Sequence, residues 1–193
     1  MRHSIGCALR HRSTQRCACR PGARLQPTPP HHSINGSEDS LKQVQDLDAD
    51  ILLVEDDPND AELVGRALKR AGAVAAISHV QDGAEALDYL YGRGRFAGRA
   101  GRAQPKLVLL DLKLPKLTGL EVLRDIRSNP DLQRLVVVML TSSREERDLQ
   151  EAYRSGVNSY VVKAVNFEEL MDSLSRLAYY WLRVNQLPQL RKS

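Results

Sequence analysis

Cysteine is scarce in this 193-residue chain, and its three cysteines, Cys7, Cys17 and Cys19, all lie near the N-terminus. Their number is odd, and the spacing of Cys17 and Cys19 matches no zinc-binding pattern. His3 and His11 lie nearby and could bind a metal, but free, solvated side chains are the simpler interpretation. The absence of cysteine from the rest of the chain excludes a disulfide-stabilised domain and is typical of a reducing compartment.

Long apolar runs are missing as well. No stretch reaches the length that a transmembrane helix needs. The N-terminus is rich in arginine, but it lacks the apolar segment of a secretory signal. We therefore expect a cytoplasmic protein that does not enter a membrane.

Aromatic residues make up only 5 % of the chain, and none alternate with the arginines in a way that supports base stacking. The net charge of +4 comes mainly from residues 1–48, which hold seven of the 28 Lys and Arg and four of the 24 acids. Residues 49–193 are left with 21 basic and 20 acidic residues, so this part is nearly neutral. Nucleic-acid binding through the basic segments stays an alternative that rests on electrostatic attraction alone.

Residues 1–48 also have almost no periodic apolar positions, and they contain breakers such as Pro29 and Gly36. Such a segment buries too little apolar surface to offset its loss of entropy on folding. We predict a disordered basic tail at 1–48, one folded domain at 49–184 and a C-terminal extension at 185–193.

From residue 49 onwards, short apolar segments alternate with segments of helical periodicity. The predicted strands are 51–54, 75–80, 106–110, 135–140 and 160–162, each followed by a helix, the last from Asn166 to Val184. Asp57 is expected to cap the first helix and Ser143 the fourth, with Glu145 and Glu146 in that helix's first turn. This alternation predicts an α/β fold with a five-stranded parallel sheet and helices on both faces.

The segment from Gly92 to Arg102 contains four glycines, four arginines and no acid. It is long for a connection in an α/β protein. A flexible, solvated insertion is the simpler interpretation, and a contact surface for an acidic or phosphorylated partner is the alternative.

Complementary polar residues follow four of the predicted strands: Glu55 and Asp56, Asp111, Thr141, and Lys163. The carboxyl ends of parallel strands lie at one edge of the sheet, where α/β proteins bind ligands. Three carboxylates there repel one another unless a cation or shared protons compensate, and an all-oxygen set favours Mg²⁺. Each residue alone is equally consistent with a helix cap or a solvated strand end. Together they predict a phosphoryl-transfer site with an aspartate nucleophile.

These motifs resemble the receiver domain of bacterial two-component response regulators. The similarity covers about residues 50–184. It rests on Val54-Glu55-Asp56, on Asp111 with Leu114-Pro115 and Gly119, on Thr141, and on Tyr160-Val-Val-Lys163. It implies a flavodoxin-like fold with strand order 2-1-3-4-5. It also implies a phosphoacceptor protein rather than an enzyme, with only self-phosphorylation and autodephosphorylation as intrinsic activities.

The resemblance implies a role for each matching position. Asp111 is the expected phosphoacceptor, Thr141 and Lys163 are expected to hold the phosphoryl oxygens, and Tyr160 is the expected aromatic switch. The expected Mg²⁺ ligands are Asp111 and Asp56 directly, Glu55 through water, and the backbone carbonyl of Lys113.

The implied phosphodonor is a sensor histidine kinase. The insertion before Lys106 and the C-terminal segment 178–188 resemble single-domain regulators paired with bacterial and cyanobacterial phytochrome kinases, so a bacteriophytochrome is the expected kinase. Nothing like a DNA-binding domain follows, so the signal is expected to pass to a downstream protein or phosphotransfer partner. The apolar stripe of the last helix either packs on the sheet or contributes, with Tyr180, Trp181 and Leu187, to a homodimer interface.

Ala164 departs from the family pattern, which has proline directly after the lysine, often with a cis bond. A cis bond before a non-proline residue costs about 2.5–4 kcal/mol. We therefore expect a trans bond and a reshaped loop that affects the choice of partner.

Two other functions fit parts of the pattern. A phosphohydrolase with an aspartate nucleophile would need a second acid two residues later, where this chain has Lys113. A receiver-like module that binds partners without being phosphorylated would not require Asp111, Thr141 and Lys163 together.

Overall fold

A five-stranded parallel sheet forms the centre of the computed structural model, which describes residues 49–70 and 76–186. The strands are β1 (Ile51–Val54), β2 (Ile77–Val80), β3 (Leu107–Leu110), β4 (Val137–Thr141) and β5 (Ser159–Val162). They lie in the order β2-β1-β3-β4-β5, and each neighbouring pair is parallel. The predicted fold class and strand order are therefore confirmed. The predicted tail at 1–48 and most of the predicted extension at 185–193 lie outside the described residues.

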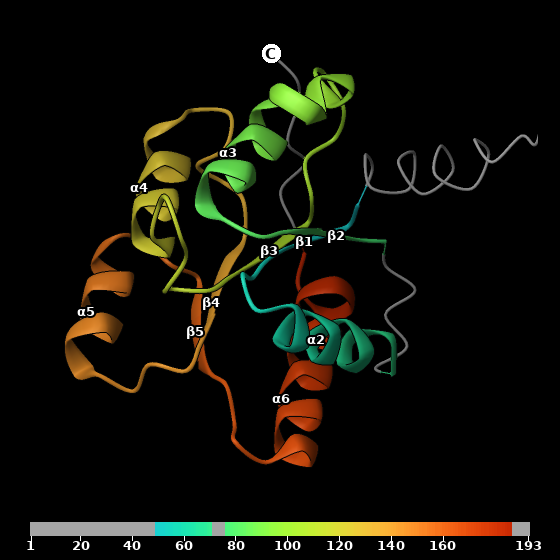
Figure 1. The fold of residues 1–193 in the computed structure, drawn as a ribbon, viewed down its shortest axis with the longest axis vertical. Helices are drawn as coiled ribbons and strands as arrows, with labels where there is room; N and C mark the ends of the chain where they lie inside the picture. The colour runs from blue at the N-terminus through green and yellow to red at the C-terminus, as the bar shows by residue number, and fades with distance from the viewer. Residues whose placement is uncertain (1–48, 71–75, 187–193) are drawn as a thin grey trace, which may run out of the picture. The chain divides into compact units, whose positions relative to one another are not determined.

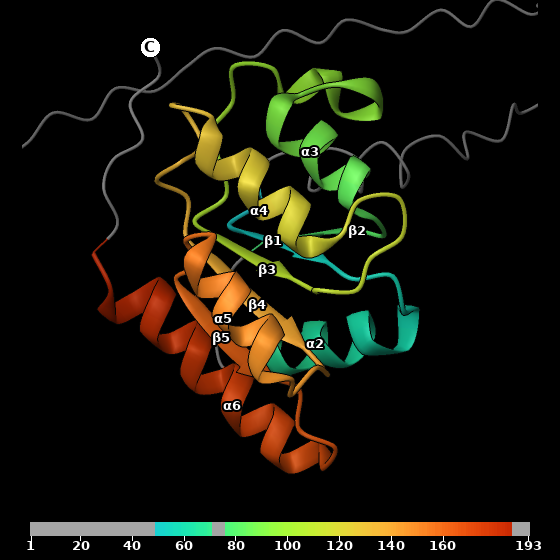
Figure 2. The ribbon, with the colours of Figure 1, turned by 90° about the vertical axis from the view of Figure 1, so that its left-hand side faces the viewer.

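Helices cover both faces of the sheet. Successive side chains of a strand point to opposite faces, so a continuous apolar strand places apolar side chains on both. In β1, Ile51 and Leu53 pack with residues of α2 (Pro58–Arg70) and α6 (Phe167–Tyr179), whereas Leu52 and Val54 pack with residues of α3 (Gly83–Tyr91) and α4 (Gly119–Ser128). Figure 1 shows α2 and α6 on one face, with α3, α4 and α5 (Glu146–Arg154) on the other. Figure 2 shows α3 and α4 packed side by side.

Side-chain caps fix the start of several helices at the edge where the strands end. The Oδ1 atom of Asp57 accepts a hydrogen bond from the backbone N–H of Asn59 at 2.7 Å, so its predicted capping role is confirmed. Asp82 caps α3, and Thr118 forms a capping box with Glu121 at the start of α4. These caps hold the loops that carry the predicted site residues.

The start of α5 differs from the prediction. The helix begins at Glu146, and its N-cap residue, Glu145, makes no side-chain capping bond. Ser143 lies before the helix in a turn, because its backbone N–H donates to Thr141 Oγ1 at 3.2 Å. Its hydroxyl donates to Asp148 at 2.6 Å. The predicted cap was wrong, and the loop after β4 is longer than expected.

The last helix follows the prediction to Tyr179 and then widens into a π-helical turn, Tyr180–Val184. Asn166 caps its start. Leu170, Leu174 and Leu177 are buried against the sheet, and Trp181 packs partly against the same core. Most of the apolar stripe therefore packs on the sheet. Among the described helices, none combines the length and hydrophobicity needed to cross a bilayer.

The basic insertion is folded rather than flexible, although most of its residues are exposed as the solvated interpretation predicted. Residues Gly94–Arg99 form a 3-10 segment that is kinked at Phe96, and Phe96 and Arg99 are buried. Phe96 packs edge-on against Tyr89 of α3, with ring centroids 5.1 Å apart. The Arg99 guanidinium donates to the hydroxyl of Tyr89 at 2.7 Å and to its backbone carbonyl at 3.1 Å. One aromatic ring and one arginine therefore anchor the insertion on α3.

Candidate functional site

The register of the sheet brings four strand ends to one edge. Val54 pairs with Leu110, and Thr141 pairs with Val162. The residues that follow are held by backbone hydrogen bonds: Asp111 N–H donates to the Val54 carbonyl at 3.0 Å, and Lys163 N–H donates to the Thr141 carbonyl at 2.8 Å. The strands thus place the predicted site residues together.

Three acids meet at this edge. Glu55, Asp56 and Asp111 each offer a carboxylate oxygen, and these oxygens all lie within 4.8 Å of one another. Glu55 is 2 % exposed and Asp111 is 8 % exposed, whereas Asp56 faces solvent. Oxygen ligands in such a partly open group suit a hard divalent cation that keeps some of its waters.

Electrostatics at Glu55 point to the same conclusion. Burial raises the pKa of Glu55 to about 7, although its hydrogen bond with Lys163 opposes the shift. The charges of Asp111 and Asp60 raise it further. A divalent cation bound beside Glu55 would stabilise its ionised form against this burial.

Asp111 is fixed through one of its two carboxylate oxygens. Its Oδ1 atom accepts a hydrogen bond from the backbone N–H of Leu112 at 2.7 Å. The start of α4 packs directly behind it, because a Cβ atom on Gly119 would lie 2.1 Å from the Asp111 carbonyl oxygen. The Oδ2 atom lies 3.9 Å from Lys163 Nζ. Oδ2 is therefore the oxygen left for chemistry.

Lys163 is held among acids. Its Nζ atom lies 2.6 Å from Glu55 Oε2 and 2.8 Å from Asp60 Oδ2. Burial disfavours its charge, but the hydrogen bonds to Asp60 and Glu55 outweigh burial, and the pKa of Lys163 is raised. The lysine thus stays positively charged beside Asp111.

The sequence analysis did not include Asp60 among the site residues, because an acid in the first turn of a helix is explained by helix stabilisation alone. Asp57 and Pro58 start α2 directly at the sheet edge, and this start turns the third helical residue toward the site. The Asp57-Pro58 helix start was therefore the sequence signal that could have placed Asp60 at the site.

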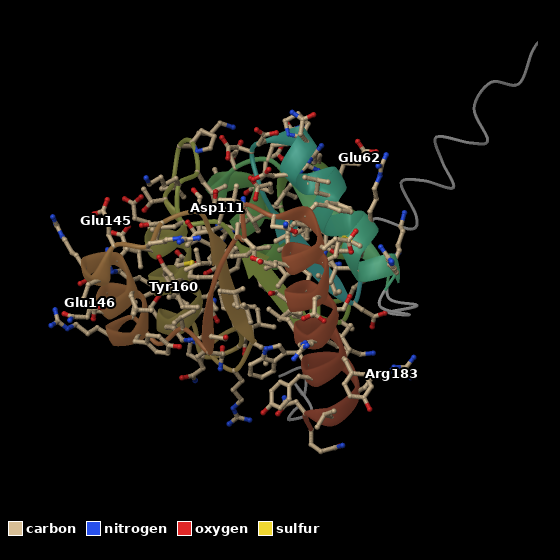
Figure 3. The ribbon with its side chains drawn as sticks, turned by 90° about the horizontal axis from the view of Figure 1, so that it is seen from below. Glu62, Asp111, Glu145, Glu146, Tyr160 and Arg183 are labelled. Carbon is tan, nitrogen blue, oxygen red and sulfur yellow. The ribbon has the colours of Figure 1, made fainter. Side chains whose placement is uncertain are left out.

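Thr141 and Tyr160 both contact one loop residue. Thr141 is fully buried, and its Oγ1 atom accepts a hydrogen bond from the backbone N–H of Ser143. The Tyr160 hydroxyl donates to the Ser143 carbonyl at 3.3 Å. Figure 3 shows Tyr160 on the side of the sheet that α5 covers, and burial raises its pKa. A change at Thr141 would therefore reach Tyr160 through Ser143.

The loop after β3 carries Lys113, which is exposed. An ion pair of 2.6 Å between Lys116 and Asp82 ties this loop to the start of α3. The role of the Lys113 carbonyl as a metal ligand stays a prediction. The peptide bond between Lys163 and Ala164 is trans, as expected: the described residues contain no cis peptide bond.

Comparisons with known proteins agree with this geometry. The model of the response regulator receiver domain family matches residues 51–175. The probable methanogenesis regulatory protein FilR2 of Methanothrix harundinacea is 44 % identical over 138 residues, which cover 72 % of this chain and 86 % of that protein. Response regulator Rcp1 of Synechocystis is 38 % identical over 138 residues, covering 72 % and 92 %.

Solved structures show the same fold. The phosphorylated cyanobacterial phytochrome response regulator RcpA matches with a TM-score of 0.67 at 38 % identity, over 72 % of this chain and 97 % of that one. The Mn²⁺-bound form of Rcp1 matches with a TM-score of 0.64 at 38 % identity, over the same shares. The predicted resemblance to phytochrome response regulators is thereby confirmed. With a family match over more than half of its length and the site residues at one sheet edge, the chain belongs to the response regulator receiver domain family.

Proposed function

We propose that this protein accepts a phosphoryl group on Asp111 from the phosphohistidine of a sensor kinase, in a Mg²⁺-dependent reaction. The observation that carries the proposal is the meeting of the acid group with Lys163 and Thr141 at one edge of the sheet. A phosphohydrolase is disfavoured, because Lys113 occupies the position where such an enzyme needs its second acid.

The contacts support a role for each residue. Asp111 Oδ2 attacks phosphorus, an O–P bond forms, and the P–N bond of the phosphohistidine breaks, leaving a neutral or protonated imidazole on the kinase. Lys163, 3.9 Å from Oδ2, supplies positive charge to one phosphoryl oxygen. The Thr141 hydroxyl, at the end of β4, donates a hydrogen bond to a second phosphoryl oxygen. Glu55, Asp56, Asp111 and the Lys113 carbonyl would hold Mg²⁺, which when bound neutralises charge on the phosphoryl oxygens.

The new charge then acts on the loop after β4. A phosphoryl group adds about −1.5 to −2 charges at neutral pH and draws the Thr141 hydroxyl toward it. That movement weakens the hydrogen bond between Thr141 Oγ1 and Ser143 N–H, and Ser143 also carries the contact with Tyr160. The surface formed by α5, β5 and α6 changes as a result.

Partner choice follows from the relatives and from the loop after Lys163. RcpA is a phytochrome response regulator, and this supports a bacteriophytochrome as the kinase. Val165 is 97 % exposed and Phe167 43 % exposed beside the site, where a kinase or a downstream phosphotransfer protein would bind. Because histidine kinases draw on ATP, the proposal places the protein in the cytoplasm.

Incubation with acetyl phosphate, with and without Mg²⁺, tests the proposal. We expect a covalent phosphoprotein that forms only with Mg²⁺ and that survives acid better than base, because the product is an acyl phosphate. Intact-protein mass spectrometry would follow the added mass, and chelation with EDTA is the control. Equal labelling in EDTA, or no labelling from either acetyl phosphate or a phosphorylated kinase, would contradict the proposal.

A homodimer is the second part of the proposal. Tyr179, Tyr180 and Val184 are 62 %, 49 % and 50 % exposed at the end of α6, and Tyr180 stacks edge-on against Trp181. Leu187 lies outside the described residues. We expect the wild type to sediment as a dimer at micromolar concentration, and Tyr180→Ala to shift it toward monomer. Tyr153→Ala, at a 53 % exposed tyrosine on α5, is the matched control. A monomeric wild type would refute the dimer.

A further inference from the structure

Lys163 makes its shortest contacts to two acids other than Asp111. Its Nζ atom lies 2.6 Å from Glu55 and 2.8 Å from Asp60, but 3.9 Å from Asp111. The lysine side chain is only 10 % exposed, so solvent cannot replace these partners easily. An ammonium group has three N–H donors. Two of them are engaged, and the third is available on the side of Asp111.

Glu55 and Asp60, the two partners of Lys163, differ in their other contacts. Glu55 belongs to the group of acids that suits a divalent cation, and a bound ion would compete with Lys163 for its oxygens. Asp60 is not a member of that group. Its carboxylate is 41 % exposed and comes from the first turn of α2, whose start is fixed by the Asp57 cap. Asp60 would therefore keep its contact with Lys163 if a bound ion engaged Glu55.

We propose that Asp60 is a positioning residue for phosphoryl transfer: it anchors the Lys163 ammonium at the sheet edge, so that a free N–H of Lys163 points to the phosphoryl group on Asp111. The proposal rests on the proposed function above. The alternative is that Asp60 only stabilises the start of α2, because an acid in the first turn of a helix does so without any lysine. The two roles are separable by experiment.

The first experiment needs no metal. Thermal unfolding in EDTA would be measured for Asp60→Asn, Lys163→Met and the double variant. We expect Asp60→Asn to lower Tm by about 3–5 °C, as the loss of a partly buried ion pair does in a domain of this size. The same change should have little effect in the Lys163→Met background. An equal loss in both backgrounds would show that Asp60 acts only on its helix, and would overturn the proposal.

The second experiment measures the rate of Asp111 phosphorylation by acetyl phosphate at saturating Mg²⁺. We expect Asp60→Asn to slow it roughly five-fold, the effect of losing one hydrogen-bonded ion pair. Asp60→Glu should recover part of the rate. Glu62→Gln is the matched control, because Glu62 lies on the same helix, is paired with Arg66 and is well separated from Asp111 (Figure 3). That variant should react like the wild type.

The outcomes separate the two proposals. A wild type that takes up no phosphoryl group refutes the proposed function, and the positioning role falls with it. A wild type that is labelled normally, with Asp60→Asn as fast as Glu62→Gln, refutes the positioning role alone. Slower labelling of Asp60→Asn, with partial recovery in Asp60→Glu, supports both.

Discussion

Asp111→Asn is expected to reduce phosphoryl incorporation to background, the largest functional effect that we predict. An amide is not a nucleophile toward phosphorus under these conditions, and no other acid occupies the end of β3. The fold should persist, because the asparagine carbonyl can still accept the hydrogen bond that Leu112 N–H now donates to Asp111 Oδ1. Incubation with acetyl phosphate and Mg²⁺, followed by intact-protein mass spectrometry, would measure the loss.

A stability measurement distinguishes loss of the nucleophile from loss of structure. The charge of Asp111 raises the pKa of Glu55, so its removal relieves repulsion in the metal-free protein. We expect the metal-free variant to be at least as stable as the wild type. Asp131→Asn, at an exposed acid in the loop before β4, is the matched control and should be labelled normally. Label retained on folded Asp111→Asn would mean that another residue is the phosphoacceptor.

Gly119→Ala is expected to have the largest effect on stability. The added Cβ would lie 2.1 Å from the Asp111 carbonyl oxygen and 3.0 Å from Leu112 Cα. Both are backbone atoms at the end of a central strand, so neither can move away cheaply. The first turn of α4 must shift instead, and its capping box moves with it. We expect a cost of about 3 kcal/mol, the upper end for overpacking, and a Tm lower by about 10 °C.

The same change should impair phosphorylation, because Asp111 lies directly against the displaced turn. Gly65→Ala is the matched control: nothing lies within 4 Å of its added Cβ, and it sits inside α2. Replacing a helical glycine there should stabilise the protein by about 0.5–1 kcal/mol. Thermal unfolding of the two variants should therefore shift in opposite directions. A Gly119→Ala protein with wild-type Tm would show that α4 does not pack tightly on Asp111.

Where local interactions dominate, the sequence predicted the structure well. The strand at 51–54 was confirmed residue for residue, because a continuous apolar segment is stable only when both faces of a strand are covered. Asp57 caps its helix as expected, because its side chain bonds a backbone N–H two residues away. Ser143 was misplaced because the helix begins three residues later, at Glu146: the Ser143 Oγ atom accepts a hydrogen bond from Glu145 N–H at 3.4 Å, and Glu145 precedes the helix.

The insertion 92–102 shows the limit of composition. Its glycines and arginines predict a solvated loop, yet Phe96 and Arg99 are buried on Tyr89. Arg99 is stable there because the hydroxyl and carbonyl of Tyr89 satisfy its donors, and because its guanidinium lies over the Tyr89 ring. These contacts join residues seven and ten positions apart, and they exist only once α3 has formed.

The sequence by itself determined the order of strands and helices along the chain. It also determined which polar residues follow the strands, because both depend on periodicity and on residues close in the chain. Only the tertiary structure decided how Lys163 is shared. It bonds Glu55, 108 residues away, and Asp60, 103 residues away, more closely than Asp111. A parallel sheet brings these residues within hydrogen-bonding distance, but the choice among them depends on the position of α2 and on burial of the ammonium group, which no local pattern encodes.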